Sequence, residues 1–272
     1  MSPRLPLSAG RLTMARSFLF VPGDRPDRFD KAVATDADAV ILDLEDAVAA
    51  PDKERARELV AAWLGAGNGA VVRINAPGTP WSDDDLAMAA GLGAPVMVPK
   101  SEDPAVLADL ACRTAGKSAL IPLVETAIGV ERAPEVCVTA GAVRIALGNV
   151  DLAGQLGVAH DDRAALAYAR ARLVSASAAA GLCAPVDGVT TSVKDLALLA
   201  EDVAHARRLG FAAKLCIHPG QVPVVAKGFA PTEDERAWAR SVLTAGESVT
   251  VVDGHMVDKP VLDRARRILA ID

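Results

Sequence analysis

The chain has 272 residues, enough for one large domain or two small ones, and its 51% hydrophobic content excludes an intrinsically disordered protein. Its 29 basic and 35 acidic residues give a net charge of −6, which argues against nucleic acid or an anionic membrane as a partner. Aromatic residues make up only 3%, so the chain also lacks the rings on which single-stranded nucleic acid would stack.

Residues 1–15 contain Arg4 and Arg11 but no continuous apolar stretch, so they do not form a secretory signal, and we expect them to be disordered. The four cysteines are far apart and form no CxxC pair, which predicts neither a zinc site nor a disulfide framework. No apolar run reaches the roughly 20 residues that a membrane span requires. We therefore expect a cytoplasmic protein.

Eight short apolar runs, of the kind found in buried parallel strands, follow one another along the chain. They cover residues 17–21, 39–42, 70–74, 95–98, 119–124, 143–147, 184–186 and 213–217. Stretches with helical patterning separate the runs; residues 52–64, for example, place Ala56, Val60 and Trp63 on one face. Eight strands alternating with helices predict an α/β fold, a closed (β/α)₈ TIM barrel over residues 16–228.

The chain continues beyond the eighth unit. Thr232 and Glu235 have the spacing of a capping box that opens a helix, and a last helix is predicted over residues 261–270. Because eight strand–helix units do not need these residues, we expect residues 229–272 to form a C-terminal helical extension.

In a TIM barrel the carboxyl ends of the strands face the active site, so polar residues directly after the apolar runs are candidate functional residues. They are Asp43, Glu45, Asp46, Arg73, Asn75, Lys100, Glu125, Asp151, Asp187 and His218. Taken singly, Asp187 or Lys100 is better explained as a helix cap or an ion-pair partner, and His218 as part of a turn. Together, several carboxylates on one rim are costly to bury without a cation, which favours a metal between them.

Glu125 and Asp151 are the best candidates for metal ligands, because both supply hard oxygen atoms from neighbouring strands. Mg²⁺ fits this description, since it takes one or two carboxylates and leaves its other positions to water and substrate. The alternative is that each carboxylate caps the helix that follows it. Arg73 lies in a buried-strand pattern and needs an anion, which could be Asp43, Glu45 or a bound carboxylate.

Seven motifs in this order make the chain resemble the citrate lyase β-subunit-like family, within the HpcH/HpaI aldolase superfamily. They are Phe18-Leu-Phe-Val-Pro-Gly, Ile41-Leu-Asp-Leu-Glu-Asp-Ala-Val, Val72-Arg-Ile-Asn, Val98-Pro-Lys, Val124-Glu-Thr-Ala, Gly148 followed by Asp151, and Cys216-Ile-His-Pro. The resemblance covers about residues 16–262. A further match, Gly254-His-Met-Val-Asp-Lys-Pro, is similar to the family's C-terminal lid motif.

This resemblance implies a TIM-barrel lyase that cleaves or forms a carbon–carbon bond in a 3-hydroxyacyl-CoA thioester. The substrates would be of the malyl-CoA or citramalyl-CoA type, and the products acetyl-CoA and a 2-oxo acid. Mg²⁺ would be the cofactor, held by Glu125 and Asp151, with Glu125 also facing the substrate.

The resemblance also assigns roles beyond the metal. Arg73 matches the substrate-binding arginine and would take part in catalysis, and Asp258 matches a lid aspartate that acts as acid or base across a trimer interface. A homotrimer or a dimer of trimers is therefore expected. Three further rim residues would support the metal and substrate ligands; they are Asp43, Glu45 and Lys100.

Relatives commonly carry an acidic residue directly before the metal-binding aspartate, where this chain has Val150. Three alternatives stand beside the leading hypothesis, and this departure motivates the last of them. They are a citryl-thioester lyase that acts on an acyl-carrier partner, an aldolase for free 2-oxo acids, and a non-catalytic acyl-CoA-binding barrel. Arg25 and Arg28, just after the first strand, could meet a coenzyme A phosphate or simply be solvated.

Overall fold

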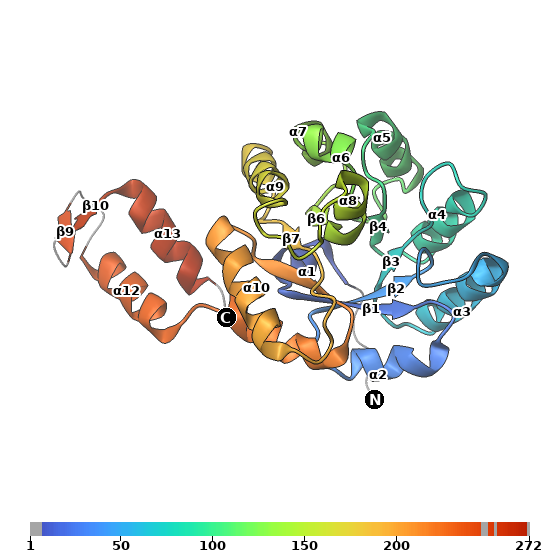
Figure 1. Cartoon of the computed structure of the whole chain (residues 1–272), viewed down its shortest axis with the longest axis horizontal. Coiled ribbons are helices and arrows are strands. Elements are labelled where there is room, and N and C mark those ends of the chain that lie inside the picture. Colours follow the sequence, from blue (N-terminus) through green and yellow to red (C-terminus); the bar gives the residue numbers. More distant parts are fainter. Residues whose placement is uncertain (1–6, 246–249, 253–254, 271–272) are drawn as a thin grey trace. The chain divides into compact units, whose positions relative to one another are not determined.

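The computed structural model describes residues 7–245, 250–252 and 255–270 of the chain. Eight parallel strands pair in sequence order and close into a barrel (Figure 1). They are β1 (Ser17–Pro22), β2 (Ala39–Asp43), β3 (Val71–Arg73), β4 (Val96–Val98), β5 (Leu120–Val124), β6 (Ala146–Leu147), β7 (Val186–Asp187) and β8 (Ala213–Cys216). Each strand overlaps one of the eight apolar runs, and the predicted (β/α)₈ barrel is confirmed.

Helices follow the strands and surround them on the outside (Figure 1). They are α2 (Phe29–Val33), α3 (Lys53–Gly65), α4 (Ser82–Gly91), α5 (Pro104–Arg113), α6 (Ala127–Glu131), α7 (Ala133–Cys137), α8 (Asn149–Leu156), α9 (Ala167–Ala179), α10 (Leu196–Leu209) and α11 (Val222–Phe229). Three single 3₁₀ turns add to the connections: η1 (Pro26–Arg28), η2 (Ala50–Asp52) and η3 (Pro219–Gln221). None of the helices in the described ranges is long and apolar enough to cross a membrane.

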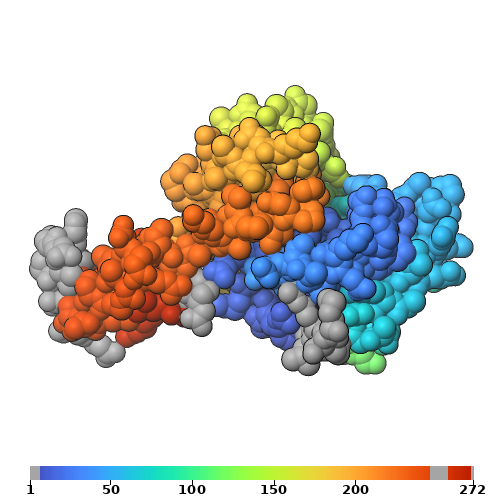
Figure 2. Space-filling model, turned by 90° about the horizontal axis from the view of Figure 1, so that it is seen from below, coloured from blue at the N-terminus to red at the C-terminus, as the bar shows by residue number. Residues whose placement is uncertain are grey.

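The barrel closes where its first strand meets its last. β1 pairs with β8 in parallel, with Phe18 opposite Leu215. In the space-filling view of Figure 2, blue atoms from near the N-terminus lie directly against orange atoms from the last part of the barrel.

The alternation of side chains along each strand decides which polar residues reach the mouth of the barrel. Ile41, Val71 and Leu123 belong to the apolar cluster that fills the barrel interior. Because side chains in a strand alternate between two faces, the residue two positions later points to the same side. Those residues are Asp43, Arg73 and Glu125, respectively.

The floor of the barrel corrects our expectation for the N-terminal segment. Residues 1–6 lie outside the described residues, but Ala9–Met14 form a helix, α1, instead of the disordered tail that we expected for residues 1–15. The Ser8 side chain caps this helix, and Leu12 is fully buried in the interior cluster. The fully buried Arg144 donates hydrogen bonds to the carbonyl oxygens of Leu12 and Ala15, at 3.2 and 2.6 Å. The segment is ordered because it covers the apolar floor.

Residues 229–272 form a second compact unit, separate from residues 1–228. It contains α12 (Glu233–Thr244), α13 (Lys259–Leu269) and a two-stranded antiparallel sheet of β9 (Thr250–Val252) and β10 (His255–Val257). The predicted capping box is present, with Thr232 and Glu235 bonded reciprocally. The unit has its own apolar core, which includes Val242, Leu262 and Ala265. Gly254 of the lid-like motif lies outside the described residues.

Candidate active site

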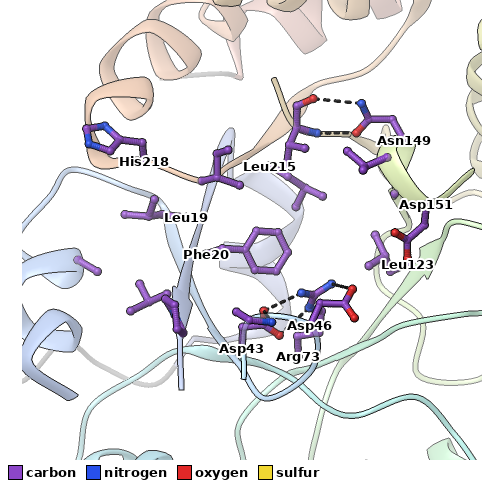
Figure 3. A pocket seen from close by; sticks show the side chains of 18 of the residues that line it. Leu19, Phe20, Asp43, Asp46, Arg73, Leu123, Asn149, Asp151, Leu215 and His218 are labelled. Carbon is purple, nitrogen blue, oxygen red and sulfur yellow. Dashed lines mark hydrogen bonds and ion pairs between the residues drawn. The ribbon is translucent and has the colours of Figure 1, made fainter. Parts of the chain in front are cut away.

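A cavity of about 780 Å³ opens at the carboxyl ends of the barrel strands. Apolar side chains such as Phe20 and Leu215 form part of its wall, and charged side chains including Asp43, Arg73 and Asp151 form the rest. Figure 3 shows Asp43 and Arg73 together below the ring of Phe20, with Asp151 to its right. A cavity of this size with a few convergent polar groups is typical of a small-molecule site.

Glu125 and Asp151 come from neighbouring strands and share one cation. Glu125 directly follows β5, and Asp151 lies in the first turn of α8, directly after β6. The Glu125 carboxylate is buried, while Asp151 is partly exposed to the pocket. The Lys100 ammonium lies between them, hydrogen-bonded to Asp151 Oδ2 and 3.2 Å from Glu125 Oε1. Both predicted ligands therefore reach a single cationic centre.

Gly148 makes room for the Glu125 carboxylate. A Cβ atom at this position would lie only 2.5 Å from Glu125 Oε2, closer than any side chain tolerates. The backbone of the turn between β6 and α8 can therefore approach the carboxylate only as glycine. This explains the glycine of the Gly148…Asp151 motif in physical terms.

Lys100 follows β4 with an unusual backbone. Its φ of 49° lies in the left-handed region, which costs a non-glycine residue about 1–3 kcal/mol and is common at functional sites. Its backbone N–H donates a 2.8 Å hydrogen bond to Glu125 Oε1. Burial lowers the pKa of the Lys100 ammonium, but the hydrogen bond to Asp151 and the charge of Glu125 outweigh it and raise the pKa above its usual value. Lys100 therefore stays charged.

Arg73 forms a two-pronged ion pair with Asp43 on the adjacent strand. Nε and Nη2 donate to the two Asp43 oxygens at 2.7 and 2.6 Å, and the guanidinium lies 4.8 Å from the centre of the Phe20 ring. Burial opposes the charged form, but the bonds with Asp43 raise the pKa of Arg73 above its ordinary value. Arg73 thus has the protein partner that we weighed as an alternative, and it also lines the pocket.

Glu45 is the carboxyl group at the mouth of the pocket whose pKa is shifted most. Its Oε2 lies 2.9 Å from Arg73 Nη1, in an ion-pair contact without hydrogen-bond geometry. Burial, assisted by the charge of Glu125, raises the pKa of Glu45 to about 8 despite the opposing charge of Arg73. Lys53 holds this loop by donating to the carbonyl oxygens of Leu44 and Glu45, at 2.8 and 2.6 Å. Lys53 looked like an ordinary first-turn residue of a surface helix, and no pattern in the sequence marked it.

Asn149 is a second residue that the sequence motifs did not single out. Its side-chain amide donates to the carbonyl oxygens of His160 and Val189 and accepts from the Val189 backbone N–H. A Cβ at Gly188 would lie 2.0 Å from Asn149 Oδ1, so the loop after β7 packs directly on this amide. Asn149 therefore anchors the start of α8, two residues before Asp151.

Asp187 does not join the pocket. It is fully buried on the outer side of the strands, where it accepts hydrogen bonds from Lys214 at 2.8 Å and Arg170 at 3.0 Å. The expectation that it reaches the rim is wrong, and the ion-pair interpretation is correct. His218 lines the pocket and accepts a hydrogen bond from the Gly220 backbone, so it also forms the expected turn.

Asp258 belongs to the C-terminal unit. Its side chain accepts a 3.3 Å hydrogen bond from the Val261 backbone N–H and so caps α13. The carboxylate is partly exposed, and its role as an acid or base stays a prediction.

The pocket residues fit a hard divalent cation. Across the described ranges, no three His, Cys, Asp or Glu side chains form a closed metal cage. Mg²⁺ does not need one, because it usually retains waters and uses one or two protein carboxylates. Glu125 and Asp151 already enclose an ammonium ion, and their two negative charges exceed its single positive charge. The donor set therefore suits a small doubly charged ion.

Comparison with known proteins gives consistent matches. The family model described as HpcH/HpaI aldolase/citrate lyase matches residues 16–219. A citrate lyase subunit beta-like protein of Mycobacterium tuberculosis is 40% identical over 262 residues, which cover 93% of each chain. A (3S)-malyl-CoA thioesterase of Cereibacter sphaeroides is 34% identical over 271 residues, covering 94% of this chain and 93% of that protein.

A solved structure extends this likeness to three dimensions. The crystal structure of the CitE protein of Mycobacterium tuberculosis, in complex with magnesium, acetoacetate and coenzyme A, matches with a TM-score of 0.82 and 37% identity. The match covers 95% of this chain and 98% of that one. The chain therefore belongs to the HpcH/HpaI aldolase/citrate lyase family.

Proposed function

We propose that this protein is a Mg²⁺-dependent lyase that cleaves, or forms in reverse, the carbon–carbon bond of a 3-hydroxyacyl-CoA thioester. Malyl-CoA and citramalyl-CoA are the substrate type, with acetyl-CoA and a 2-oxo acid as products. The observation that carries this proposal is the pair of carboxylates, Glu125 and Asp151, that share one cation at the mouth of the pocket. A related structure contains magnesium, acetoacetate and coenzyme A together, which supports the same combination here.

The residues around the pocket divide the chemical work. Glu125 and Asp151 would hold Mg²⁺, which when bound supplies positive charge for the substrate hydroxyl and carboxylate oxygens. Arg73, fixed by Asp43, orients the acid group of the substrate through its remaining N–H bonds. Asp258 takes the proton from the substrate hydroxyl as the carbon–carbon bond breaks. The thioester enolate that leaves then takes the proton back from Asp258 and becomes acetyl-CoA.

The basic side chains at the pocket favour a coenzyme A ester over a free acid. Arg28 and Lys31 line the cavity, and both can meet phosphate groups. Arg25 is paired with Asp27 at 3.0 Å on the surface, so we interpret it as a solvated surface residue and not as a phosphate ligand. We expect the protein to act in the cytoplasm as a homotrimer or a dimer of trimers, with Asp258 reaching the pocket of a neighbouring copy.

The test is an assay of the purified full chain with Mg²⁺ and a panel of free CoA thioesters. We expect turnover that Glu125→Gln lowers by at least about 100-fold, while Glu58→Gln, at an exposed position of α3, has no effect. Activity that survives thorough chelation would refute the proposal. Activity on a carrier-bound citryl group, with none on free thioesters, would instead identify a citryl-thioester lyase.

Asp258 is tested separately. Asp258→Asn should lose most of kcat while the oligomer persists in light scattering. Asp263→Asn, in the helix that Asp258 caps, removes the charge that pairs with Arg266 on the surface and is the control. An unchanged rate in Asp258→Asn would remove this residue from the mechanism.

A further inference from the structure

Lys100 occupies the position between two carboxylates where a bound metal would be expected. Its ammonium is hydrogen-bonded to Asp151 Oδ2 and lies 3.2 Å from Glu125 Oε1. These are the two residues to which we assign Mg²⁺. An ammonium and a divalent cation cannot both occupy this position between the carboxylates, because like charges at such distances repel strongly.

The backbone around Lys100 is fixed in the conformation that directs its side chain there. The left-handed φ of 49° is held by the hydrogen bond from Lys100 N–H to Glu125 Oε1 and by Ser101, whose N–H donates to the Leu123 carbonyl at 3.1 Å. The Ser101 hydroxyl also donates to the Val98 carbonyl at 2.8 Å. The base of the side chain is therefore rigid.

The end of the side chain is not enclosed by the protein. The Lys100 side chain is 37% exposed, in contrast to the 3% of Glu125. Four rotatable bonds separate the ammonium from the fixed backbone, so it can withdraw without any change of the main chain.

We propose that Lys100 is an internal cation that holds Glu125 and Asp151 together before the metal binds and that Mg²⁺ must displace. Without it, the two carboxylates would repel each other at a partly buried site. With it, the site is preassembled, but the affinity for the metal is lowered by the competition. This inference rests on the proposed metal site and adds a residue that tunes its occupancy.

The test is Mg²⁺ binding to the metal-free full chain, measured by titration calorimetry. Lys100→Met should bind Mg²⁺ about tenfold more tightly or better, since the competing charge is gone. Lys100→Arg, which retains the charge, should bind as weakly as the wild type. Lys117→Met, at an exposed position before β5 and thus at the other end of the barrel, should leave the affinity unchanged. Equal or weaker binding by a folded Lys100→Met would overturn the proposal.

Thermal stability separates this role from a purely structural one. In chelator, Lys100→Met should melt at a lower temperature than the wild type. At saturating Mg²⁺ the two proteins should melt at the same temperature. A loss of the same size with and without Mg²⁺ would contradict the proposal.

A measurement on the wild type covers the case in which Lys100→Met does not fold. Acetylation of the intact protein, read by mass spectrometry, should label Lys100 several-fold faster with Mg²⁺ than without it, and Lys117 equally in both. Unchanged or slower labelling of Lys100 would overturn the proposal.

The same data distinguish a failure of this inference from a failure of the proposed function. Wild-type and Lys100→Met proteins that both fail to bind Mg²⁺ would defeat both proposals. Mg²⁺-dependent turnover without tighter binding by Lys100→Met would defeat only the role of Lys100.

Discussion

Arg73 and Asp43, at the ends of adjacent strands, are joined by two parallel hydrogen bonds of 2.7 and 2.6 Å. This fork-to-fork geometry fixes both the position and the plane of the guanidinium at the pocket wall. An arginine held in this way can present its remaining N–H groups to a substrate carboxylate without first losing side-chain entropy.

Arg73→Lys tests the importance of that plane. Lysine keeps the charge but cannot form the fork, so we expect kcat/KM for the thioester to fall by about 100-fold with little change in fold. Arg113→Lys, on the exposed surface of α5, should leave kcat/KM unchanged. A wild-type rate in Arg73→Lys would mean that only the charge is needed.

Gly148→Ala tests the close contact with Glu125. The added methyl group would lie 2.5 Å from Glu125 Oε2 and must displace the carboxylate, so Mg²⁺ affinity should fall by about tenfold or more. Gly154→Ala, in the helix α8 that follows Gly148 and in open space, is the control and should stabilise the protein by about 0.5–1 kcal/mol. Equal Mg²⁺ affinity in the two variants would contradict the packing argument.

Glu45→Gln tests the raised pKa of Glu45. The folded protein holds this proton up to about pH 8, whereas the unfolded chain releases it near its ordinary value of 4.5. The folded state therefore binds more protons between these values, and the free energy of unfolding should decrease with rising pH, by at most about 1.4 kcal/mol per pH unit.

Glutamine has no proton to release, so the variant should lack this part of the pH dependence. Urea unfolding in chelator, repeated at several pH values between 5 and 8, measures the difference in the free energy of unfolding between the two proteins. We expect Glu45→Gln to gain stability relative to the wild type as the pH rises. A constant difference would show that Glu45 is ionised in the folded protein.

Leu12→Ala tests whether α1 is part of the barrel core. Leu12 is fully buried, and its truncation should reduce the free energy of unfolding by about 2–5 kcal/mol. Met14→Ala, in the same helix but 57% exposed, should change it by no more than about 0.5 kcal/mol. Similar losses in both variants would contradict the assigned packing.

The strands and the mouth residues were predictable because buried parallel strands are apolar on both faces and end at one rim. Asp43, Arg73 and Glu125 each follow an interior residue by two positions, so their direction follows from alternation. The same rule would have corrected the expectation for Asp187: it is adjacent to the interior residue Val186 and must point outward. A count of polar residues at strand ends ignores whether each side chain points inward or outward, and so it did not separate Asp187 from the pocket residues.

Other features had no local pattern to reveal them. α1 spans only six residues, and its burial depends on a floor built by strands far along the chain. Lys53 bonds to carbonyl oxygens of the loop before it, a contact that depends on tertiary geometry. Short helices and side chain to backbone bonds of this kind are set by packing rather than by propensity.

The buried trio of Asp187, Lys214 and Arg170 has a consequence for protein engineering. Replacing Asp187 alone would leave the Lys214 and Arg170 cations without their shared partner under α9, at a cost of about 3–5 kcal/mol. Replacing all three at once by apolar residues of matching volume removes that penalty. Libraries that vary these positions one at a time will therefore miss stable combinations that simultaneous randomisation would recover.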